Sequence, residues 1–231
     1  MRIGQINIRR GFIKKIDAIE KIVCENDFQI LGMTETDLDE YETVPTLRGF
    51  LCLTSNEKKR RVCAYITEEY QIEELRYDGS LPCVVVFHLA QSTVGIIYSQ
   101  FTKDKEPQTD KMRREDLKEF LTWFAGIAKN RASIHGDFNV DWGTSSPLKS
   151  MLESWSKNND FVQMIKTSTR TAKNNLGQIT RKCIDLVFVR KQKASTFIFD
   201  GGISDHNGTG TTVSRGTAQP HFYKWFGKDS S

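Results

Sequence analysis

Short apolar segments that end in a polar residue recur along this 231-residue chain, and this pattern limits its possible folds more than any other feature. The segments have the length of strands and are separated by helical patterns or turn-rich stretches. A buried charge costs free energy unless it is paired or bound to a metal, so polar residues at strand ends are candidates for one shared site. The residues concerned are Asn7, Glu35, Tyr98, Asp137, Asn139, Asp185, Asp205 and His206.

The clearest of these positions lies in residues 134–143, which read I-H-G-D-F-N-V-D-W-G. Strand alternation predicts that the side chains of Asp137 and Asn139 point to the same side of an extended segment, above the edge of a sheet. Gly136 allows a sharp turn or a close backbone approach there. A carboxylate that orients a water, beside an amide that donates to an anionic oxygen, suits phosphate-ester chemistry. Alone, however, an Asp-x-Asn after a strand is more often a turn or cap feature.

Asp185 is the polar position with the fewest alternative explanations. It lies in C-I-D-L-V-F-V, residues 183–189, where apolar residues surround it. A carboxylate in such a strand is expected to pair with a histidine, a cation or a metal. Each of the other polar residues, taken singly, also fits an ordinary turn, loop, core or surface position.

The remaining pattern predicts a single α/β domain. Apolar periodicity predicts helices from Ile13 to Val23, from about Asp110 to Ala128, and over 148–155 after Pro147. Alternating or continuous apolar runs predict strands at 2–8, 28–33, 49–53, 61–67, 83–89, 93–98, 132–135 and 183–189, with a weak signal at 211–214. The domain is expected to span residues 1–215, and residues 216–231 form a polar tail or the start of a linker.

Positive charge is concentrated in one part of the chain. The net charge is +4, but residues 166–193 contain eight cations and a single acid, Asp185. A lopsided stretch of this kind favours a polyanionic partner, because each phosphate contact releases condensed counterions. A basic surface loop without a ligand is the alternative explanation.

Cysteine usage and hydropathy bear on location. The five cysteines form neither a CxxC pair nor a zinc pattern with the four histidines, which favours reduced thiols in the cytosol or nucleus. No apolar run approaches the roughly 20 residues of a membrane span, so no membrane association is expected. The chain begins directly on a strand-like pattern without the apolar segment of a signal peptide, so it is not expected to be secreted.

Taken in order, the polar motifs resemble those of the endonuclease–exonuclease–phosphatase superfamily. The motifs are Asn7, T-E-T at 34–36, Tyr98, G-D-F-N at 136–139, I-D-L at 184–186 and S-D-H at 204–206. The resemblance covers about residues 2–212. It implies the DNase I-like fold, a four-layered α/β sandwich in which two mixed β-sheets pack face to face with helices outside.

Within the superfamily, the chain looks most similar to the apurinic-like endonuclease domain of non-LTR (LINE-type) retrotransposons. The small size, the basic T-R-T stretch before I-D-L-V-F-V and the start on the first strand all fit that group. The resemblance implies a Mg²⁺-dependent, or Mn²⁺-dependent, endonuclease that nicks double-stranded chromosomal DNA. The 3′-hydroxyl exposed by the nick primes reverse transcription. It also implies a nuclear site of action after synthesis in the cytosol, a reverse transcriptase in the parent polyprotein, and an isolated domain that is monomeric.

Two features depart from the family pattern. Repair-type apurinic endonucleases usually carry an acid two residues after the first-strand asparagine, where this chain has Arg9. This substitution argues against a second metal contact near Asn7 and against an abasic-site repair enzyme, which is the nearest alternative. After S-D-H the chain reads N-G-T-G-T-T, which predicts an irregular last strand.

The resemblance also implies roles for the polar residues. Glu35 is the main metal ligand, and Asp205 is either a further ligand or an orienting residue. Asp137 orients or deprotonates the attacking water. Asn7, Tyr98 and Asn139 contact the scissile phosphate. His206 acts on the phosphate or the water, with its imidazole held by Asp185. The choice of general base stays open between these groups.

Residues 171–182 are predicted to form a hairpin over the DNA groove, with 174–175 or 176–177 at its tip. Polar amides and Arg181 there are expected to read base edges or a narrow minor groove, or else to contact phosphate only. The residues expected to bind nucleic acid are Arg9, Arg170, Lys173, Asn174, Asn175, Arg181 and Lys182. A catalytically inactive nucleic-acid-binding module is the alternative from another class, and another phosphodiesterase of the superfamily is the alternative within it.

Overall fold

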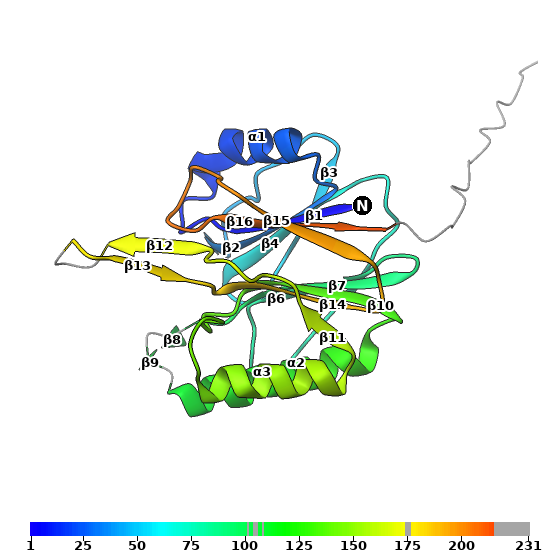
Figure 1. The fold of residues 1–231 in the computed structure, drawn as a ribbon. Helices are drawn as coiled ribbons and strands as arrows, with labels where there is room; N and C mark the ends of the chain where they lie inside the picture. The colour runs from blue at the N-terminus through cyan, green and yellow to red at the C-terminus, as the bar shows by residue number, and fades with distance from the viewer. Residues whose placement is uncertain (101, 104–105, 108, 174–176, 215–231) are drawn as a thin grey trace, which may run out of the picture.

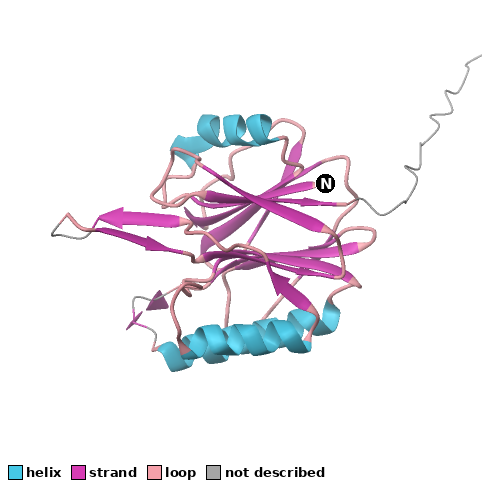
Figure 2. Cartoon of the chain, in the orientation of Figure 1, coloured by secondary structure: helices cyan, strands magenta, loops and turns pink. Residues whose placement is uncertain are grey.

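Two six-stranded β-sheets pack face to face in the computed structural model, with helices on both outer faces (Figures 1 and 2). The structure describes residues 1–100, 102, 103, 106, 107, 109–173 and 177–214. Both sheets are mixed, and the helices form the two outer layers of the sandwich. The predicted fold class is therefore confirmed.

The first sheet has the strand order β15-β16-β1-β2-β4-β3. Its strands are β1 (Arg2–Asn7), β2 (Ile30–Asp39), β3 (Phe50–Thr54), β4 (Lys59–Thr67), β15 (Ala194–Phe199) and β16 (Gly208–Val213). β1 is antiparallel to β16 and parallel to β2, because helix α1 (Ile16–Asn26) carries the chain from the end of β1 back to the start of β2.

The second sheet has the strand order β11-β14-β10-β7-β6-β5. Its strands are β5 (Glu73–Leu75), β6 (Val84–His88), β7 (Ser92–Tyr98), β10 (Arg131–Asp137), β11 (Phe161–Gln163) and β14 (Asp185–Arg190). β10 is parallel to β7 and antiparallel to β14. Each sheet therefore has a parallel pair whose carboxyl ends lie at one edge.

The helices form where the apolar periodicity predicted them. The short turn η1 (Ile13–Lys15) and α1 (Ile16–Asn26) cover the first sheet, while α2 (Asp110–Ile127) and α3 (Pro147–Asn158) cover the second (Figure 1). Thr109 and Ser146 cap α2 and α3 by accepting hydrogen bonds from the backbone N–H of Met112 and Lys149. Within the described residues, no helix has the length and apolarity that a membrane span requires.

Two short ribbons extend from the sandwich. One pairs β8 (Thr102–Lys103) with β9 (Glu106–Pro107). The other pairs β12 (Arg170–Lys173) with β13 (Ile179–Lys182) and projects well beyond the body of the molecule (Figure 1). The predicted hairpin is thus present, but its expected tip residues Asn174 and Asn175 lie outside the described residues.

The layer between the sheets changes from apolar to polar along β1. Strand alternation points Ile3, Gln5 and Asn7 to the same side. Ile3 joins a buried cluster with Ile30 and Ile96, whereas Gln5 and Asn7 are fully buried polar residues. One strand therefore contributes to the core at its start and to a polar site at its end.

The last strand corrects an expectation from the sequence. β16 is a regular strand that pairs with both β1 and β15, whereas the glycine-rich N-G-T-G-T-T had predicted an irregular one. Gly210 is required because the Phe197 ring covers it: a Cβ there would lie 2.2 Å from the ring Cζ. The glycines make room for aromatic rings and do not interrupt the strand.

Candidate active site

The predicted polar residues gather at the edge where the parallel pairs β1–β2 and β7–β10 end. Register places Asn7 beside Thr34 in one sheet, and Asp137 beside both Tyr98 and Asp185 in the other. The two sheets face each other, so these ends meet across the sandwich. Topology thereby brings together residues separated by up to about 200 positions in the sequence.

Asn7 joins the two sheets through its side-chain amide. Its Nδ2 donates hydrogen bonds to Glu35 Oε1 and to Asp137 Oδ2, each at 2.9 Å. Tyr98 donates its hydroxyl to the same Glu35 oxygen at 3.1 Å. The Asn7 Oδ1 accepts from the backbone N–H of Arg9 at 2.8 Å, which fixes the orientation of the amide. One neutral side chain therefore holds two carboxylates in place.

Asp137 is almost completely buried at the end of β10. Burial and, next, the charge of Asp185 raise the pKa of Asp137 to about 7, against the lowering effect of His206 and the hydrogen bonds from Asn7 and Asn139. A carboxyl group with this pKa can take up a proton near neutral pH, which is the property of a general base.

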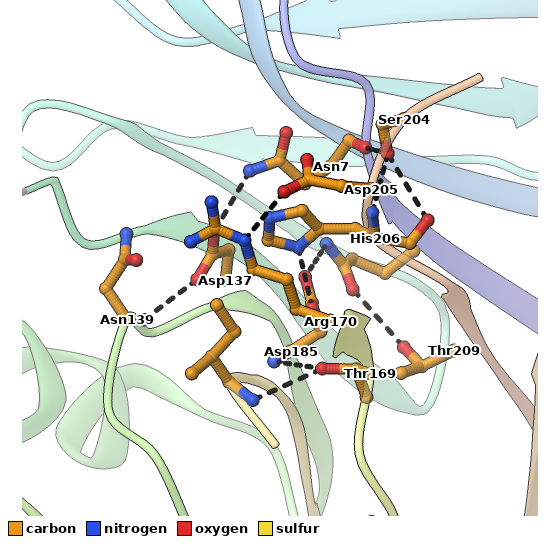
Figure 3. A network of polar contacts seen from close by, with 12 residues as sticks. Asn7, Asp137, Asn139, Thr169, Arg170, Asp185, Ser204, Asp205, His206 and Thr209 are labelled. Carbon is orange, nitrogen blue, oxygen red and sulfur yellow. Dashed lines mark hydrogen bonds and ion pairs between the residues drawn. The ribbon is translucent and has the colours of Figure 1, made fainter. Parts of the chain in front are cut away.

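His206 and Asp185 form a buried pair next to Asp137 (Figure 3). The His206 Nδ1 lies 2.9 Å from Asp185 Oδ2, and the two side chains are 4% and 0% exposed. Burial alone lowers the pKa of His206, but the hydrogen bond and charge of Asp185 outweigh it and raise that pKa above its ordinary value. Asp185 is held in turn by Gln5 Nε2 at 3.4 Å, and its backbone N–H donates to Thr169 Oγ1 at 3.0 Å.

Asp205 lies next to His206 in sequence but has different partners. Its Oδ2 accepts from Arg170 Nε at 2.9 Å (Figure 3), and its Oδ1 lies 3.5 Å from Arg9 Nη1. Partial burial raises the pKa of Asp205, but the Arg170 guanidinium outweighs it and holds the pKa below its usual range. Arg9 thus stands at the acid-rich edge as a partner of Asp205.

Asn139 reaches the site by a turn and not by strand alternation. β10 ends at Asp137, and Asn139 has φ 51°, so the alternation predicted for these two residues does not hold. The Asn139 N–H donates to Asp137 Oδ1 at 2.8 Å, and its Nδ2 donates to the Ser99 carbonyl at 2.8 Å. Of the two roles considered for Gly136, the structure shows the close approach: a Cβ there would lie 2.0 Å from the Ile97 carbonyl oxygen.

Arg113 supports this turn and is absent from the predicted set. It lies on α2, is 3% exposed, and its Nη2 donates to the carbonyls of Phe138 (3.3 Å) and Asn139 (3.0 Å). Arg113 precedes Leu117 by one helical turn, so it falls on the apolar stripe of the helix. A cation in that stripe is the sequence signal that could have identified it.

Left-handed backbone conformations concentrate at this edge. Non-glycine residues with positive φ there are Arg9 (48°), Arg10 (67°), Glu35 (55°), Asp37 (50°) and Asn139 (51°). Each costs of order 1 kcal/mol and persists only where the surroundings hold it, as at binding and catalytic sites. Glu35 is therefore held by the fold in a conformation that its own backbone preference does not favour, whereas asparagine adopts this conformation more readily.

The β12–β13 hairpin is attached to the site at its base. Arg170 contacts Asp205, the Thr171 N–H donates to the Asp205 carbonyl, and the Asn207 N–H donates to the Thr169 carbonyl. Pairing of Arg170 with Lys182 and of Thr171 with Arg181 divides the hairpin into two faces. Arg170 and Lys182 share the face toward Asp205, and Arg181 and Lys173 lie on the other.

Three side chains at the site converge closely enough to be considered as metal ligands. Candidate ligand atoms of Asp137, Asp185 and His206 all lie within 4.8 Å of one another. His206, however, uses Nδ1 for Asp185 and has a raised pKa, which favours imidazolium over a metal-binding neutral ring. The carboxylates of Glu35 and Asp137 are the oxygen donors that a hard cation prefers.

The sandwich is the DNase I-like α/β fold that the motifs predicted, and solved structures share it over most of the chain. No family model and no curated sequence matches the chain. Solved structures that it resembles include an AP endonuclease from Archaeoglobus fulgidus (TM-score 0.73, 15% identity, 93% of this chain and 100% of that chain). A variant of the 3′ phosphatase NExo from Neisseria, bound to a product DNA hairpin, gives the same four values. The endonuclease domain of TRAS1, a telomere-specific non-LTR retrotransposon, has TM-score 0.68 at 12% identity, over 93% of this chain and 98% of that chain.

Proposed function

We propose that this protein is a metal-dependent DNA endonuclease, a hydrolase that cuts a phosphodiester bond and leaves a 3′-hydroxyl end. The observation that carries the proposal is the Asn7 amide, which holds Glu35 and Asp137 from opposite sheets beside the His206–Asp185 pair. An activated water, neutralised phosphate oxygens and a stabilised leaving oxygen are the requirements of this reaction. The site has a candidate group for each.

The donor chemistry fits Mg²⁺ or Mn²⁺. Asn7 Nδ2 lies 2.9 Å from one oxygen of Glu35 and 2.9 Å from one oxygen of Asp137, so two carboxylate oxygens, the ligand type that a hard cation prefers, stand at the same amide. Glu35 is the main candidate ligand. Asp205 is a weaker candidate, because Arg170 and Arg9 already neutralise it. When bound, such a cation neutralises charge on the phosphate and stabilises the leaving 3′-oxygen.

The protein groups divide the remaining work. Asp137, with a pKa of about 7, accepts the proton of the attacking water. His206, whose pKa is raised by Asp185, donates to a non-bridging phosphate oxygen. The Tyr98 hydroxyl now donates to Glu35, and the Asn7 amide donates to Asp137. When the substrate binds, both groups donate to its phosphate instead. Asn139, oriented by the Ser99 carbonyl, is the remaining amide contact.

Double-stranded DNA is the proposed substrate, and target-primed reverse transcription by a non-LTR retrotransposon is the proposed context. The basic hairpin with Arg170, Lys173, Arg181 and Lys182 supports a long polyanionic ligand, because it projects from the edge that holds the acids (Figure 1). The likeness to the TRAS1 domain and the replacement of an acid by Arg9 support the retrotransposon context. We further propose nuclear action, a reverse transcriptase in the parent polypeptide and a monomeric domain.

Plasmid nicking compared with abasic-site cleavage tests this proposal. The wild type is expected to nick supercoiled plasmid with Mg²⁺ and not with EDTA, and a polymerase is expected to extend the nicks from their 3′-hydroxyls. Asp137→Ala and His206→Ala are expected to be inactive. Abasic cleavage hundreds of times faster than plasmid nicking would support the repair alternative, and unchanged activity in both variants would leave only a binding module.

The genomic target is tested by sequencing. Nicks made on genomic DNA by the wild type are mapped, with Asp137→Ala as the background control. A shared sequence or structural context at the nicks is expected for a retrotransposon endonuclease. Nicks spread evenly over the genome would argue against target selection by this domain.

A further inference from the structure

A second pocket lies on the far face of the β12–β13 hairpin, separate from the acid cluster. It has a volume of about 300 Å³. Its walls come from the loop after β10, from the segment between β11 and β12, and from the strand leading into β14. The lining residues are Asp141, Trp142, Gly143, Thr144, Lys166, Ser168, Arg181 and Cys183.

The pocket is tied by hydrogen bonds to the strand that carries Asp185. Asp141 Oδ1 accepts from the backbone N–H groups of Gly143 (3.0 Å) and Cys183 (3.1 Å), and the Trp142 N–H donates to the Cys183 carbonyl at 2.8 Å. These contacts fix the loop in position without a ligand. Cys183 precedes Asp185 by two residues, roughly 7 Å of extended chain.

The pocket combines an aromatic surface with positive charge. The Trp142 ring packs edge-on against Phe188 at 5.9 Å and has the ammonium groups of Lys149 and Lys166 at 5.4 and 6.0 Å from its centroid. Arg181 adds a guanidinium, and Thr144 and Ser168 add hydroxyl groups. Burial raises the pKa of Cys183 to about 11, so the thiol is neutral and adds no charge to the pocket.

These features fit an unpaired nucleotide better than the backbone of intact duplex DNA. Aromatic stacking with nearby cations is how proteins bind unpaired bases, whereas contact with duplex phosphates does not need an indole. A paired base cannot enter a pocket without leaving the helical stack.

We propose that this pocket binds an unpaired nucleotide close to the cut, with its base on Trp142 and its phosphate between Lys166 and Arg181. The inference rests on the proposed endonuclease function and extends it. A nick frees one strand end beside the site, and such an end supplies a nucleotide that need not remain paired. The pocket would then retain the cut strand after hydrolysis.

The two faces of the hairpin provide a matched pair of variants. Arg181 lines the pocket, and the adjacent Lys182 points to the other face with Arg170. Removing either cation takes the same charge from the same strand. Arg181→Gln and Lys182→Gln therefore separate a pocket effect from a general loss of attraction to DNA.

Binding to nicked duplexes, measured with EDTA, tests the proposal. One probe carries a one-nucleotide flap at the nick, a second carries an abasic flap, and a third is fully paired. Trp142→Ala is expected to weaken binding of the one-nucleotide flap probe about tenfold and binding of the other two probes less than twofold, because only the first probe offers an unpaired base to stack. Trp142→Phe is expected to retain most of the affinity. Arg181→Gln is expected to weaken binding of both flapped probes more than binding of the fully paired probe. Lys182→Gln is expected to weaken binding of all three probes equally.

The pocket assignment would be overturned if Trp142→Ala weakened binding of all three probes equally, or did not weaken binding at all. Because Trp142 also packs on Phe188, thermal unfolding of the variant is measured in parallel, and Arg181→Gln tests the same pocket from an exposed position. Failure of the endonuclease proposal would be recognised by a different result: the wild type would not nick any DNA with Mg²⁺. The binding comparison would remain informative in that case.

Discussion

His206 Nδ1 lies 2.9 Å from Asp185 Oδ2, and the two residues are brought together from strands and loops of opposite sheets. The pair is buried, so the attraction between an imidazolium and a carboxylate is weakly screened. Asp185 also contacts Gln5 from the first sheet at 3.4 Å. The pair therefore contributes both to the chemistry of the site and to the docking of the two sheets.

Asp185→Asn is expected to lower the pKa of His206 and reduce nicking by at least tenfold. The amide keeps the shape but removes the charge that raises the His206 pKa. Activity that needs imidazolium falls as pH rises through this pKa, so the alkaline limb of the pH profile shifts to lower pH in the variant. Histidine NMR titration and the nicking profile measure both shifts. An unmoved alkaline limb would show that His206 does not act as imidazolium.

The same pair makes stability depend on pH. The folded-state pKa of His206 is raised above 6.5, so its contribution to the free energy of unfolding is fully present below pH 6.5 and is lost as pH rises through the folded-state pKa. His206→Gln is therefore expected to destabilise the protein more at pH 6 than at pH 8.5. Urea unfolding at both pH values measures the difference. Equal destabilisation at the two pH values would contradict the assignment of the raised pKa to this pair.

Asp137→Asn is expected to abolish nicking and to stabilise the protein at alkaline pH. The pKa of Asp137 is raised from 3.8 to about 7, so the folded state binds the proton more tightly than the unfolded state and stability falls as pH rises from 4 to 7. Replacing the carboxylate with a neutral amide removes this loss of stability. In EDTA, the melting temperature is expected to rise by several degrees relative to wild type at pH 8, with a smaller or no rise at pH 5. An equal rise in melting temperature at both pH values would argue that the Asp137 carboxyl is not the titrating group.

Asn7→Ala is expected to destabilise the protein by about 1–3 kcal/mol and to reduce nicking by about 10²-fold or more. The substitution leaves the buried Asp137 without the amide donor and removes the side chain that hydrogen-bonds both Glu35 and Asp137. Urea unfolding and plasmid nicking provide the two measurements. Asn26→Ala on α1 is the control, because its amide donates to the Ile22 carbonyl on the same helix.

Arg113→Lys is expected to fold and to lower turnover about tenfold with little change in DNA affinity. Lysine keeps the charge but puts a tetrahedral ammonium in place of the planar guanidinium whose Nη2 donates to both carbonyls, so the turn that carries Asn139 loses support. Single-turnover nicking and DNA binding, compared with the nearby surface variant Arg114→Lys, separate positioning from binding. A tenfold loss of affinity with unchanged turnover would assign Arg113 to substrate binding instead.

The motifs predicted the site because they fall at strand ends, where backbone topology decides their positions. Asn7, Glu35, Tyr98, Asp137 and Asp185 lie on strands whose parallel and antiparallel pairing brings their ends to one edge. A polar residue at the end of an apolar strand, or within it, together with the order of the family motifs, was enough to identify such positions. It was not enough for Asn139, which leaves the strand through a left-handed turn that only the carbonyl of Ser99 and the Arg113 contacts explain.

Partners between distant segments could not be predicted from the sequence. Arg170 and Asp205 are both charged and 35 positions apart, and nothing in the sequence distinguishes this pair from the other combinations available to them. The same limit applies to β15, whose pairing with β16 depends on which glycines face Phe197 and Phe199. Packing between side chains, and not the local pattern, decides these features.

Gly210→Ala is expected to destabilise the sandwich by about 1–3 kcal/mol. The new Cβ would lie 2.2 Å from Cζ of Phe197, so the ring has to leave its place on Phe28, with which it stacks at 6.1 Å. Phe197→Leu in the same chain makes room for the methyl group and is expected to recover part of the loss, which a double-mutant cycle in urea measures. Additive effects of the two substitutions would show that the glycine is required for a reason other than the aromatic ring. Because β16 pairs with β1, whose last residue is Asn7, a loosened β16 is also expected to lower nicking before the protein unfolds.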